Sequence, residues 1–158
     1  MRVLVLYAHP VETSFNAAMH KMVVQTLREA GHEVDDCDLY AEGFDAVLSR
    51  QERLSYHDTD VNRQPVASYV DRVLNTDAIV MVHPIWNFGP PAILKGFMDR
   101  VFLPGVSFDM CEGKVTPGLT HIKKLACVVS YGAPWYRALI LGDPPRKLAT
   151  RMLRAMIK

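Results

Sequence analysis

The sequence of 158 residues has few cysteines, no excess of either charge and no long apolar run. Cys37, Cys111 and Cys127 are odd in number and show no CxxC spacing, which argues against a disulfide framework and against a zinc site. Lys and Arg total 18 against 17 Asp and Glu, so no charge field indicates a nucleic acid or an acidic lipid surface as partner. No run approaches the roughly twenty apolar residues of a membrane span, and no export signal is visible. We therefore expect one soluble, cytoplasmic domain without membrane insertion.

Several familiar motifs are also missing, and each absence removes a class of protein. No G-x-G-x-x-G follows the first apolar run, which leaves the usual dinucleotide-binding site unsupported. The segment EGKVT lacks the upstream glycine and the Ser or Thr of a phosphate-binding loop. There is no Cys followed six residues later by Arg, no G-x-S-x-G elbow and no HxxxH spacing, which argues against a small phosphatase, a serine hydrolase and a metal site.

The residues that are present alternate between strand and helix patterns. An apolar run over 3–7 predicts a strand, Thr13 or Ser14 then caps a helix, and Gly31 closes that helix. The acidic stretch 32–40 predicts an edge strand, and 41–64 is a long excursion with one short helix. Next come a helix from Pro65 to 74 and a strand 77–84 that is stopped by Pro84. A helix 92–103 between Pro91 and Pro104 and a strand 124–132 follow. The apolar residues of the last segment are expected to face inward, and they are Leu148, Ala149, Met152, Leu153, Met156 and Ile157.

This order predicts an α/β fold with a doubly wound parallel sheet. The acidic second strand fits the edge of the strand order 2-1-3-4-5. No fifth strand is found, so strand 124–132 would be an exposed apolar edge. We expect a single domain over 1–158 that is incomplete at its C-terminus, or another element that covers this edge.

In such a sheet, ligands bind beyond the carboxyl ends of the strands. Three loops are expected to converge there: 9–16, 84–88 and 130–136. Hydroxyl and amide side chains at a helix N-terminus favour a phosphate, although a Thr-Ser pair alone is more often only a cap. The aromatic residues could equally belong to a core or an interface. Together the loops indicate a phosphorylated planar cofactor, with flavin the obvious candidate. The residues behind this interpretation are Thr13, Ser14, Asn16, Trp86, Phe88, Tyr131, Gly132, Trp135, Tyr136 and Arg137.

Two segments, AHPVETSFNAAM and HPIWNFGPPAILKGFMDRVFLPGVSF, strongly resemble the NAD(P)H:quinone oxidoreductase family of flavodoxin-like flavoproteins. That family includes oxidoreductases associated with potassium-efflux channels. The resemblance implies a flavodoxin-like fold and two flavin-binding segments. The residues that match the family's loop around the flavin phosphate and ribityl chain are His9, Thr13, Ser14, Phe15, Asn16 and Ala18. The residues that match the family's segment along the isoalloxazine ring are Pro84, Ile85, Trp86, Asn87 and Phe88.

The third loop departs from the family pattern of Thr-Thr-Gly-Gly, a tyrosine and then a histidine. Ser130, Gly132 and Ala133 stand at the corresponding place, Tyr136 is the candidate tyrosine, and no histidine follows, although Arg137 could supply positive charge. We expect the backbone N–H groups of Gly132 and Ala133, with Tyr136, to stabilise charge at flavin N1 and O2. Gly132 and Tyr136 are thus the predicted catalytic residues.

The resemblance implies a hydride relay in which NAD(P)H reduces flavin N5 and a quinone or similar acceptor then takes the hydride from the same place. FMN or FAD, and NADH or NADPH, remain open. Family members are usually homodimers, and the apolar stripe Phe97, Met98, Val101 and Phe102 could serve a partner or only its own core. Two alternatives are a flavin-binding regulatory subunit in peripheral contact with a membrane transporter, and a one-electron carrier, which the near-neutral charge disfavours.

Overall fold

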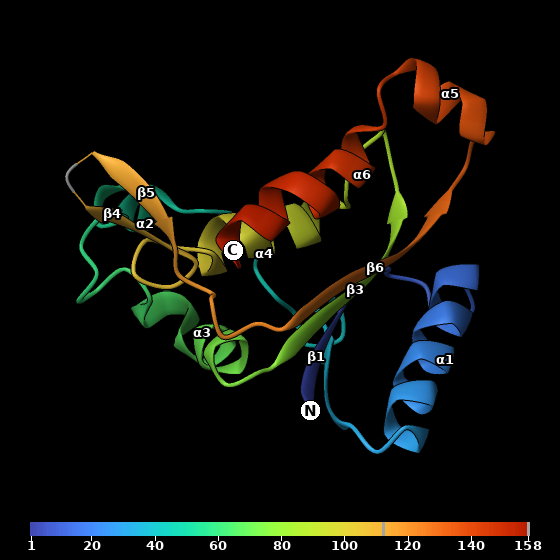
Figure 1. Ribbon diagram of the computed structural model, residues 1–158, viewed down its shortest axis with the longest axis horizontal. Helices are drawn as coiled ribbons and strands as arrows, with labels where there is room; N and C mark the ends of the chain where they lie inside the picture. The colour runs from blue at the N-terminus through green and yellow to red at the C-terminus, as the bar shows by residue number, and fades with distance from the viewer. Residues whose placement is uncertain (112, 158) are drawn as a thin grey trace.

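Four parallel strands form the centre of the structure, a computed structural model that describes residues 1–111 and 113–157 (Figure 1). They lie in the order β2 (Glu33–Asp38), β1 (Arg2–Tyr7), β3 (Ala78–Ile85) and β6 (Lys124–Tyr131). Every neighbouring pair is parallel. The predicted doubly wound sheet is therefore confirmed, with the acidic strand β2 at one edge and β6, the fourth strand of the prediction, at the other.

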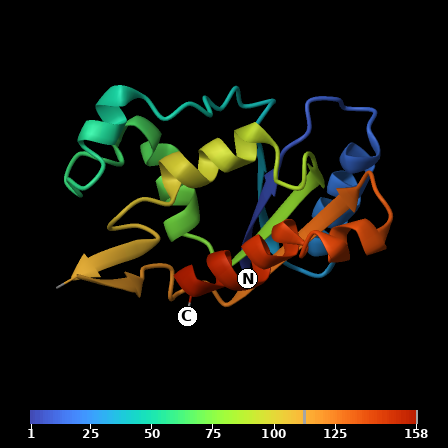
Figure 2. The ribbon, with the colours of Figure 1, turned by 90° about the horizontal axis from the view of Figure 1, so that it is seen from above.

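Helices cover both faces of this sheet (Figures 1 and 2). Because successive side chains of a strand point to opposite faces, β1 divides its residues between two cores. Val3, Val5 and Tyr7 pack with residues of α1 (Phe15–Glu29), whereas Leu4 and Leu6 join a larger cluster. That cluster contains buried residues of α3 (Ala67–Leu74) and α4 (Ala92–Val101). The central strand is hence apolar at every position from Val3 to Tyr7.

Local signals set the ends of α1 as predicted. The Ser14 hydroxyl accepts a hydrogen bond from the backbone N–H of Ala17 at 3.1 Å, which satisfies one of the free donors of the first turn. At the other end Gly31 adopts φ +77°, the left-handed conformation that closes helices. Ser14 is thus the N-cap, and the helix starts at Phe15 immediately after it.

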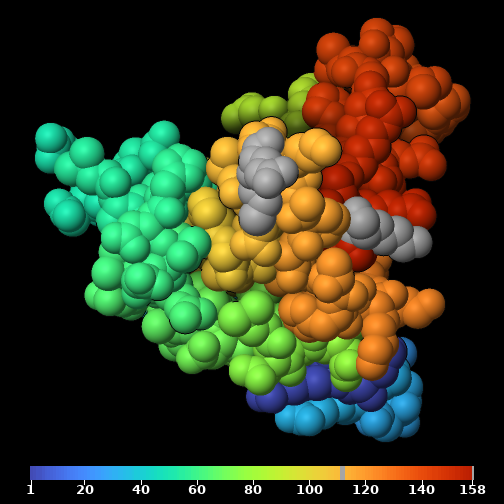
Figure 3. Space-filling model, turned by 60° about the vertical axis from the view of Figure 1, so that its left-hand side comes forward, coloured from blue at the N-terminus to red at the C-terminus, as the bar shows by residue number. Residues whose placement is uncertain are grey.

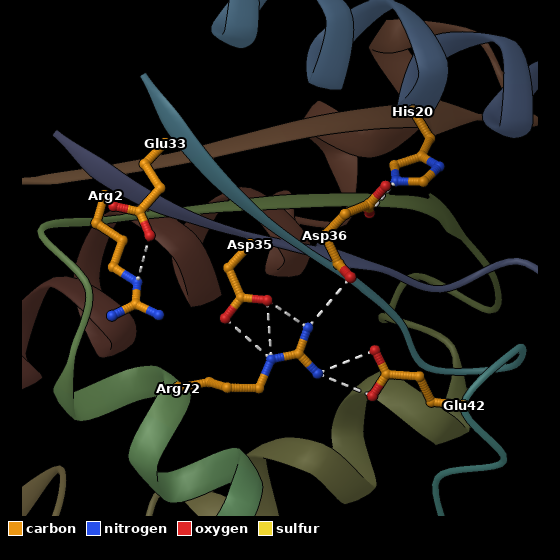
Figure 4. A network of polar contacts seen from close by, with 7 residues as sticks. All are labelled: Arg2, His20, Glu33, Asp35, Asp36, Glu42 and Arg72. Atoms are coloured by element: carbon orange, nitrogen blue, oxygen red, sulfur yellow. Dashed lines mark hydrogen bonds and ion pairs between the residues drawn. The ribbon is translucent and has the colours of Figure 1, made fainter. Parts of the chain in front are cut away.

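The excursion between β2 and α3 contains one short helix, α2 (Arg50–Leu54), followed by the 3-10 turn η1 (Gln64–Val66). Arg72 of α3 holds the start of this excursion against β2 (Figure 4). Its guanidinium donates to Asp35 at 2.6 to 3.0 Å, to Glu42 at 2.8 and 2.9 Å, and to the Asp36 carbonyl at 3.1 Å. The acidic character of β2 therefore has a structural use at Asp35, whose carboxylate accepts from this partly buried arginine head group, while Asp36 contributes its backbone carbonyl.

Two predicted boundaries are corrected. Strand β3 continues through Pro84 to Ile85, paired only with β6, since its pairing with β1 ends at Val82. A strand with one free side tolerates a residue that lacks an N–H donor. Helix α4 ends at Val101 instead of residue 103, because Phe102 takes a non-helical ψ of 67° two residues before Pro104.

An antiparallel hairpin of β4 (Phe108–Cys111) and β5 (Lys114–Pro117) was not predicted. It lies on the face that Figure 3 shows, between the excursion and the C-terminal segment. Met110 and Val115 face each other across the two strands and are exposed, so the pair carries no buried apolar face that a sequence pattern would reveal.

The C-terminal segment is less regular than predicted. After α5 (Trp135–Ile140) come α6 (Pro144–Lys147), the π-helical turn η2 (Leu148–Met152) and the 3-10 turn η3 (Leu153–Met156). Met152 was expected to face inward and is instead 39% exposed, because the change of helix type rotates it out of the stripe. Leu153 is buried, and Leu148, Ala149, Met156 and Ile157 are partly buried.

Within the described part of the chain, β6 has no strand beyond it. A cavity of about 620 Å³ lies beside this edge strand, between its side chains and the segment from Pro145 to Ile157. The expectation that something else covers this edge remains a prediction. On α4 the whole stripe of Phe97, Met98, Val101 and Phe102 is buried inside the chain, so it supplies the core and offers no surface to a partner.

Candidate functional site

The three predicted loops meet at the carboxyl edge of the sheet. Asn16, at the start of α1, is 6% exposed and donates through Nδ2 to Ser130 Oγ at 3.0 Å. The rings of His9 and Trp86 lie 5.6 Å apart between centroids, tilted by 59°. The first loop therefore contacts both of the others, and we call the assembly of residues 8–16, 84–91 and 130–137 the rim.

The first loop presents a helix N-terminus to this rim. The N-cap Ser14 is partly buried there, and Thr13, Phe15 and Ala18 are exposed around it. His9 accepts through Nδ1 the backbone N–H of Val11 at 3.1 Å, so the neutral ring carries its proton on Nε2 and can donate from it. A helix N-terminus with additional donors beside it favours a negatively charged group.

A tight turn forms the second loop. The N–H of Trp86 donates to the Gly89 carbonyl at 3.0 Å, and the N–H of Gly89 returns a bond to Trp86 at 2.9 Å. Asn87 and Phe88 at its centre have φ of 50° and 58°, the left-handed conformation that side chains avoid. Pro84 and Ile85 beneath the turn are buried, whereas Trp86 is 42% exposed. Such strain persists only where the surroundings impose it, and it concentrates at binding sites.

The third loop leaves β6 after Tyr131. Space beside Gly132 is open, since a Cβ built there meets no atom within 4 Å. Ala133 is partly buried, and α5 then exposes Trp135 and Tyr136. Their rings touch edge to face at 6.4 Å between centroids. The loop thus offers an accessible backbone and two aromatic side chains next to the rim.

Two groups at the rim escaped the sequence reasoning. The buried hydroxyl of Tyr7 has no hydrogen-bond partner among the described residues and lies near Ser14. Burial raises the pKa of this Tyr7 hydroxyl, while Ser14 opposes the rise. Asp143, which accepts a hydrogen bond from Tyr131 at 2.7 Å, was likewise not singled out. Neither belongs to a motif, and only the folded path of the chain brings them to the site.

The cavity beside β6 is not the predicted site. It touches the rim only at Ile85, Pro90 and Tyr131, and its walls are mostly apolar side chains of β3, β6 and the C-terminal segment. The rim is therefore an open edge between loops. No helix in the described ranges is long and apolar enough to cross a membrane.

Comparisons with known proteins agree with this geometry. The sequence matches the model of the family described as "Flavodoxin-like fold" over residues 1–155. An uncharacterised NAD(P)H oxidoreductase of Haemophilus influenzae is 32% identical over 134 residues, 84% of this chain and 65% of the relative. NAD(P)H dehydrogenase (quinone) 1 of Cavia porcellus is 33% identical over 124 residues, 68% of this chain and 45% of the relative.

A solved NAD(P)H:quinone oxidoreductase from Methanothermobacter marburgensis superimposes with a TM-score of 0.84 at 26% identity, covering 98% of this chain and 79% of that one. The chain spans less than two thirds of the length of the two curated relatives. Because the family model matches almost the whole chain and the sheet has the expected strand order, the chain belongs to the flavodoxin-like fold family.

Proposed function

We propose that the rim binds a flavin and that the protein is an NAD(P)H-dependent oxidoreductase whose acceptor is a quinone or a similar small molecule. The observation that carries this proposal is the meeting of a helix N-terminus, a strained aromatic turn and an open glycine loop at one edge of the sheet. The names of the curated relatives, an NAD(P)H oxidoreductase and a quinone dehydrogenase, support the reaction class.

The residues present fit such a group. The unpaired hydroxyl of Tyr7 lies near Ser14, at the N-terminus of α1, where a phosphate would find donors. The N–H groups of Asn87 and Phe88 donate to no other described residue, so the turn has two free donors. The phosphate and ribityl chain would be held by His9, Thr13, Ser14, Phe15, Asn16 and Ala18, and the ring by Pro84, Ile85, Trp86, Asn87, Phe88, Ser130, Gly132 and Ala133.

When bound, the flavin supplies the ability to take up a hydride from NAD(P)H and to pass it to an acceptor. The chain itself would bind and orient it. The N–H groups of Gly132 and Ala133 and the hydroxyl of Tyr136 would stabilise negative charge at the pyrimidine edge of the ring. Exposure of Trp86 and Tyr136 leaves the rim open to a second substrate, which an alternating exchange of NAD(P)H and acceptor requires. A homodimer is part of this proposal.

The test is to titrate the purified chain with FMN and with FAD, and then to measure NADH- and NADPH-dependent reduction of menadione. We expect one flavin to bind with quenched fluorescence and the protein to turn over. Tyr136→Phe should lower turnover roughly ten- to a hundred-fold and leave the flavin bound. Failure to bind either flavin would refute the proposal, and binding without turnover would favour the regulatory role.

A further inference from the structure

The loop between β6 and α6 is closed by a single side-chain contact across its base. Tyr131, the last residue of β6, donates its hydroxyl to Asp143 Oδ1 at 2.7 Å. Asp143 is the N-cap of α6, twelve residues further along the chain. Between them, residues 132–142 carry α5, which projects beyond the end of β6 (Figure 1). The contact therefore joins the two stems of the loop.

Asp143 combines several tasks at one position. Its N–H donates to the Ala138 carbonyl at 2.7 Å and so closes α5, while its own carbonyl accepts from Lys147 in α6 at 3.1 Å. Its carboxylate also accepts the N–H of Arg146 at 3.4 Å. With φ of 45° it is a non-glycine residue in the left-handed region. Asp143 thus joins the end of α5 to the start of α6.

Tyr131 connects the same point to the second loop of the rim. In the register of the sheet it pairs with Ile85, the residue directly before the strained turn. With its backbone paired to Ile85 and its hydroxyl bonded to Asp143, Tyr131 places the loop with Gly132 and Tyr136 relative to that turn.

We infer that the Tyr131–Asp143 hydrogen bond is a positioning contact, which fixes the base of the loop 132–142 and so sets where Gly132, Ala133 and Tyr136 lie within the rim. This inference rests on the proposed function in that it assigns the loop to the flavin site. Burial, together with the hydrogen bond to Asp143, raises the pKa of Tyr131 to about 12. The hydroxyl therefore remains protonated and able to donate at neutral pH.

The first test needs no flavin. Arg137 is exposed within the loop, so trypsin can cut there when the loop opens. Tyr131→Phe removes one hydrogen bond to a charged acceptor and should accelerate this cleavage roughly ten-fold. Asp143→Asn keeps an acceptor oxygen and the tolerance of the left-handed conformation but loses the charge, so its cleavage rate should lie between those of wild type and Tyr131→Phe. Tyr40→Phe, which removes a hydroxyl from a residue after β2, is the matched control.

The second test measures the dissociation constant of FMN by fluorescence quenching. Tyr131→Phe should weaken FMN binding roughly three- to ten-fold, because the loop must then be ordered on binding. Asp143→Asn should weaken FMN binding less than Tyr131→Phe does, and Tyr40→Phe should leave it unchanged. Equal cleavage of Tyr131→Phe and wild type would overturn the inference, as would faster cleavage with unchanged FMN affinity. If the wild type binds neither FMN nor FAD, the proposed function fails, and the proteolysis still decides whether the contact closes the loop.

Discussion

Two regions of the molecule are each stabilised by a different kind of contact. One is the rim, and the other is the excursion side, by which we mean residues 41–64 together with the parts of β2, α3 and α4 that contact them. On the excursion side, Arg72 donates to three acceptor residues, as Figure 4 shows. Arg100 of α4, 8% exposed, donates to Glu52 of α2 at 2.7 Å and to the Asp45 carbonyl, and it lies over the Phe44 ring at 5.6 Å. Each guanidinium therefore ties together elements that are distant in sequence.

At the rim, these networks are replaced by hydrogen bonds between pairs of residues, in which at most one partner is charged. Asn16 and Ser130 exchange two hydrogen bonds between neutral groups, at 3.0 and 3.4 Å, and one hydrogen bond joins Tyr131 to Asp143. Non-glycine residues with positive φ among the described residues are Asn87, Phe88 and Asp143, and all lie in the rim loops or at their base. Strain thus concentrates where ligand binding is proposed, while the multiply bonded guanidinium groups of Arg72 and Arg100 lie elsewhere. We expect changes on the excursion side to alter stability, and changes at the rim to alter ligand binding.

The largest effect is expected for Arg100→Ala. It removes a buried side chain and leaves the partly buried Glu52 without its charged partner, although Glu52 keeps the N–H of Ser49. Breaking a buried pair typically costs about 3–5 kcal/mol of the free energy of unfolding, and we expect a loss at the lower end of this range. Burial by itself would raise the pKa of Glu52, but hydrogen bonds from Ser49 and Arg100 outweigh it and lower that pKa. The stabilisation is therefore present above the ordinary pKa of a glutamate and is lost as the pH falls through the lowered value. Urea unfolding at neutral and acid pH measures both the loss of stability and its dependence on pH.

Arg2→Ala is the matched control for this experiment. It removes the same side chain from a pair with Glu33 in which both partners are well exposed, at 3.4 Å. Surface pairs contribute about 0–1 kcal/mol, so this variant should unfold almost as wild type. FMN affinity of folded Arg100→Ala should stay within roughly two-fold of wild type if the two regions are separate. A large loss of affinity would break the comparison.

The next effect concerns Ser14, which caps α1 at the rim. Ser14→Ala should cost about 1 kcal/mol of stability, the usual value of an N-cap. Ser49→Ala is the counterpart on the excursion side, since Ser49 caps α2 with a capping box and should cost about as much. Only Ser14→Ala should weaken FMN, by roughly ten-fold, and leave riboflavin, which lacks the phosphate, unaffected. An equal loss of affinity for FMN and for riboflavin would show that the phosphate does not bind at this helix terminus.

Much of the sheet could be predicted because its signals are local. Continuous apolar runs such as Val3–Tyr7 mark strands that are buried on both faces, and Ser14 and Gly31 mark the ends of α1 through their own conformations. The convergence of the loops followed from the sheet order alone, since parallel strands end at one edge. These features require no knowledge of how distant side chains meet.

The features that were missed depend on distant contacts or lack a pattern. The hairpin around Gly113 has strands of four residues with an exposed cross-strand pair, so no buried face shows in its sequence. Arg100 stands on the buried face of α4, and its position is explained by partners distant in sequence, among them Glu52, 48 residues away. Asp143 likewise becomes meaningful only when the loop brings it to Tyr131. Sequence reasoning found the rim but not the contacts that hold it.

The smallest effect on stability, and the sharpest contrast, is expected for Phe88→Gly. A phenylalanine in the left-handed region is strained by about 1–2 kcal/mol, and glycine relieves this, but it also raises the entropy of the unfolded chain and removes a half-buried ring. The terms oppose each other, so urea unfolding should change by only about 0.5 kcal/mol. Phe44→Gly, in the core of the excursion side, lacks such compensation and should cost about 3–5 kcal/mol. FMN affinity should fall for Phe88→Gly, because the turn loses its ring and its rigidity. If Phe88→Gly instead lost as much stability as Phe44→Gly, the rim would be as tightly packed as the core.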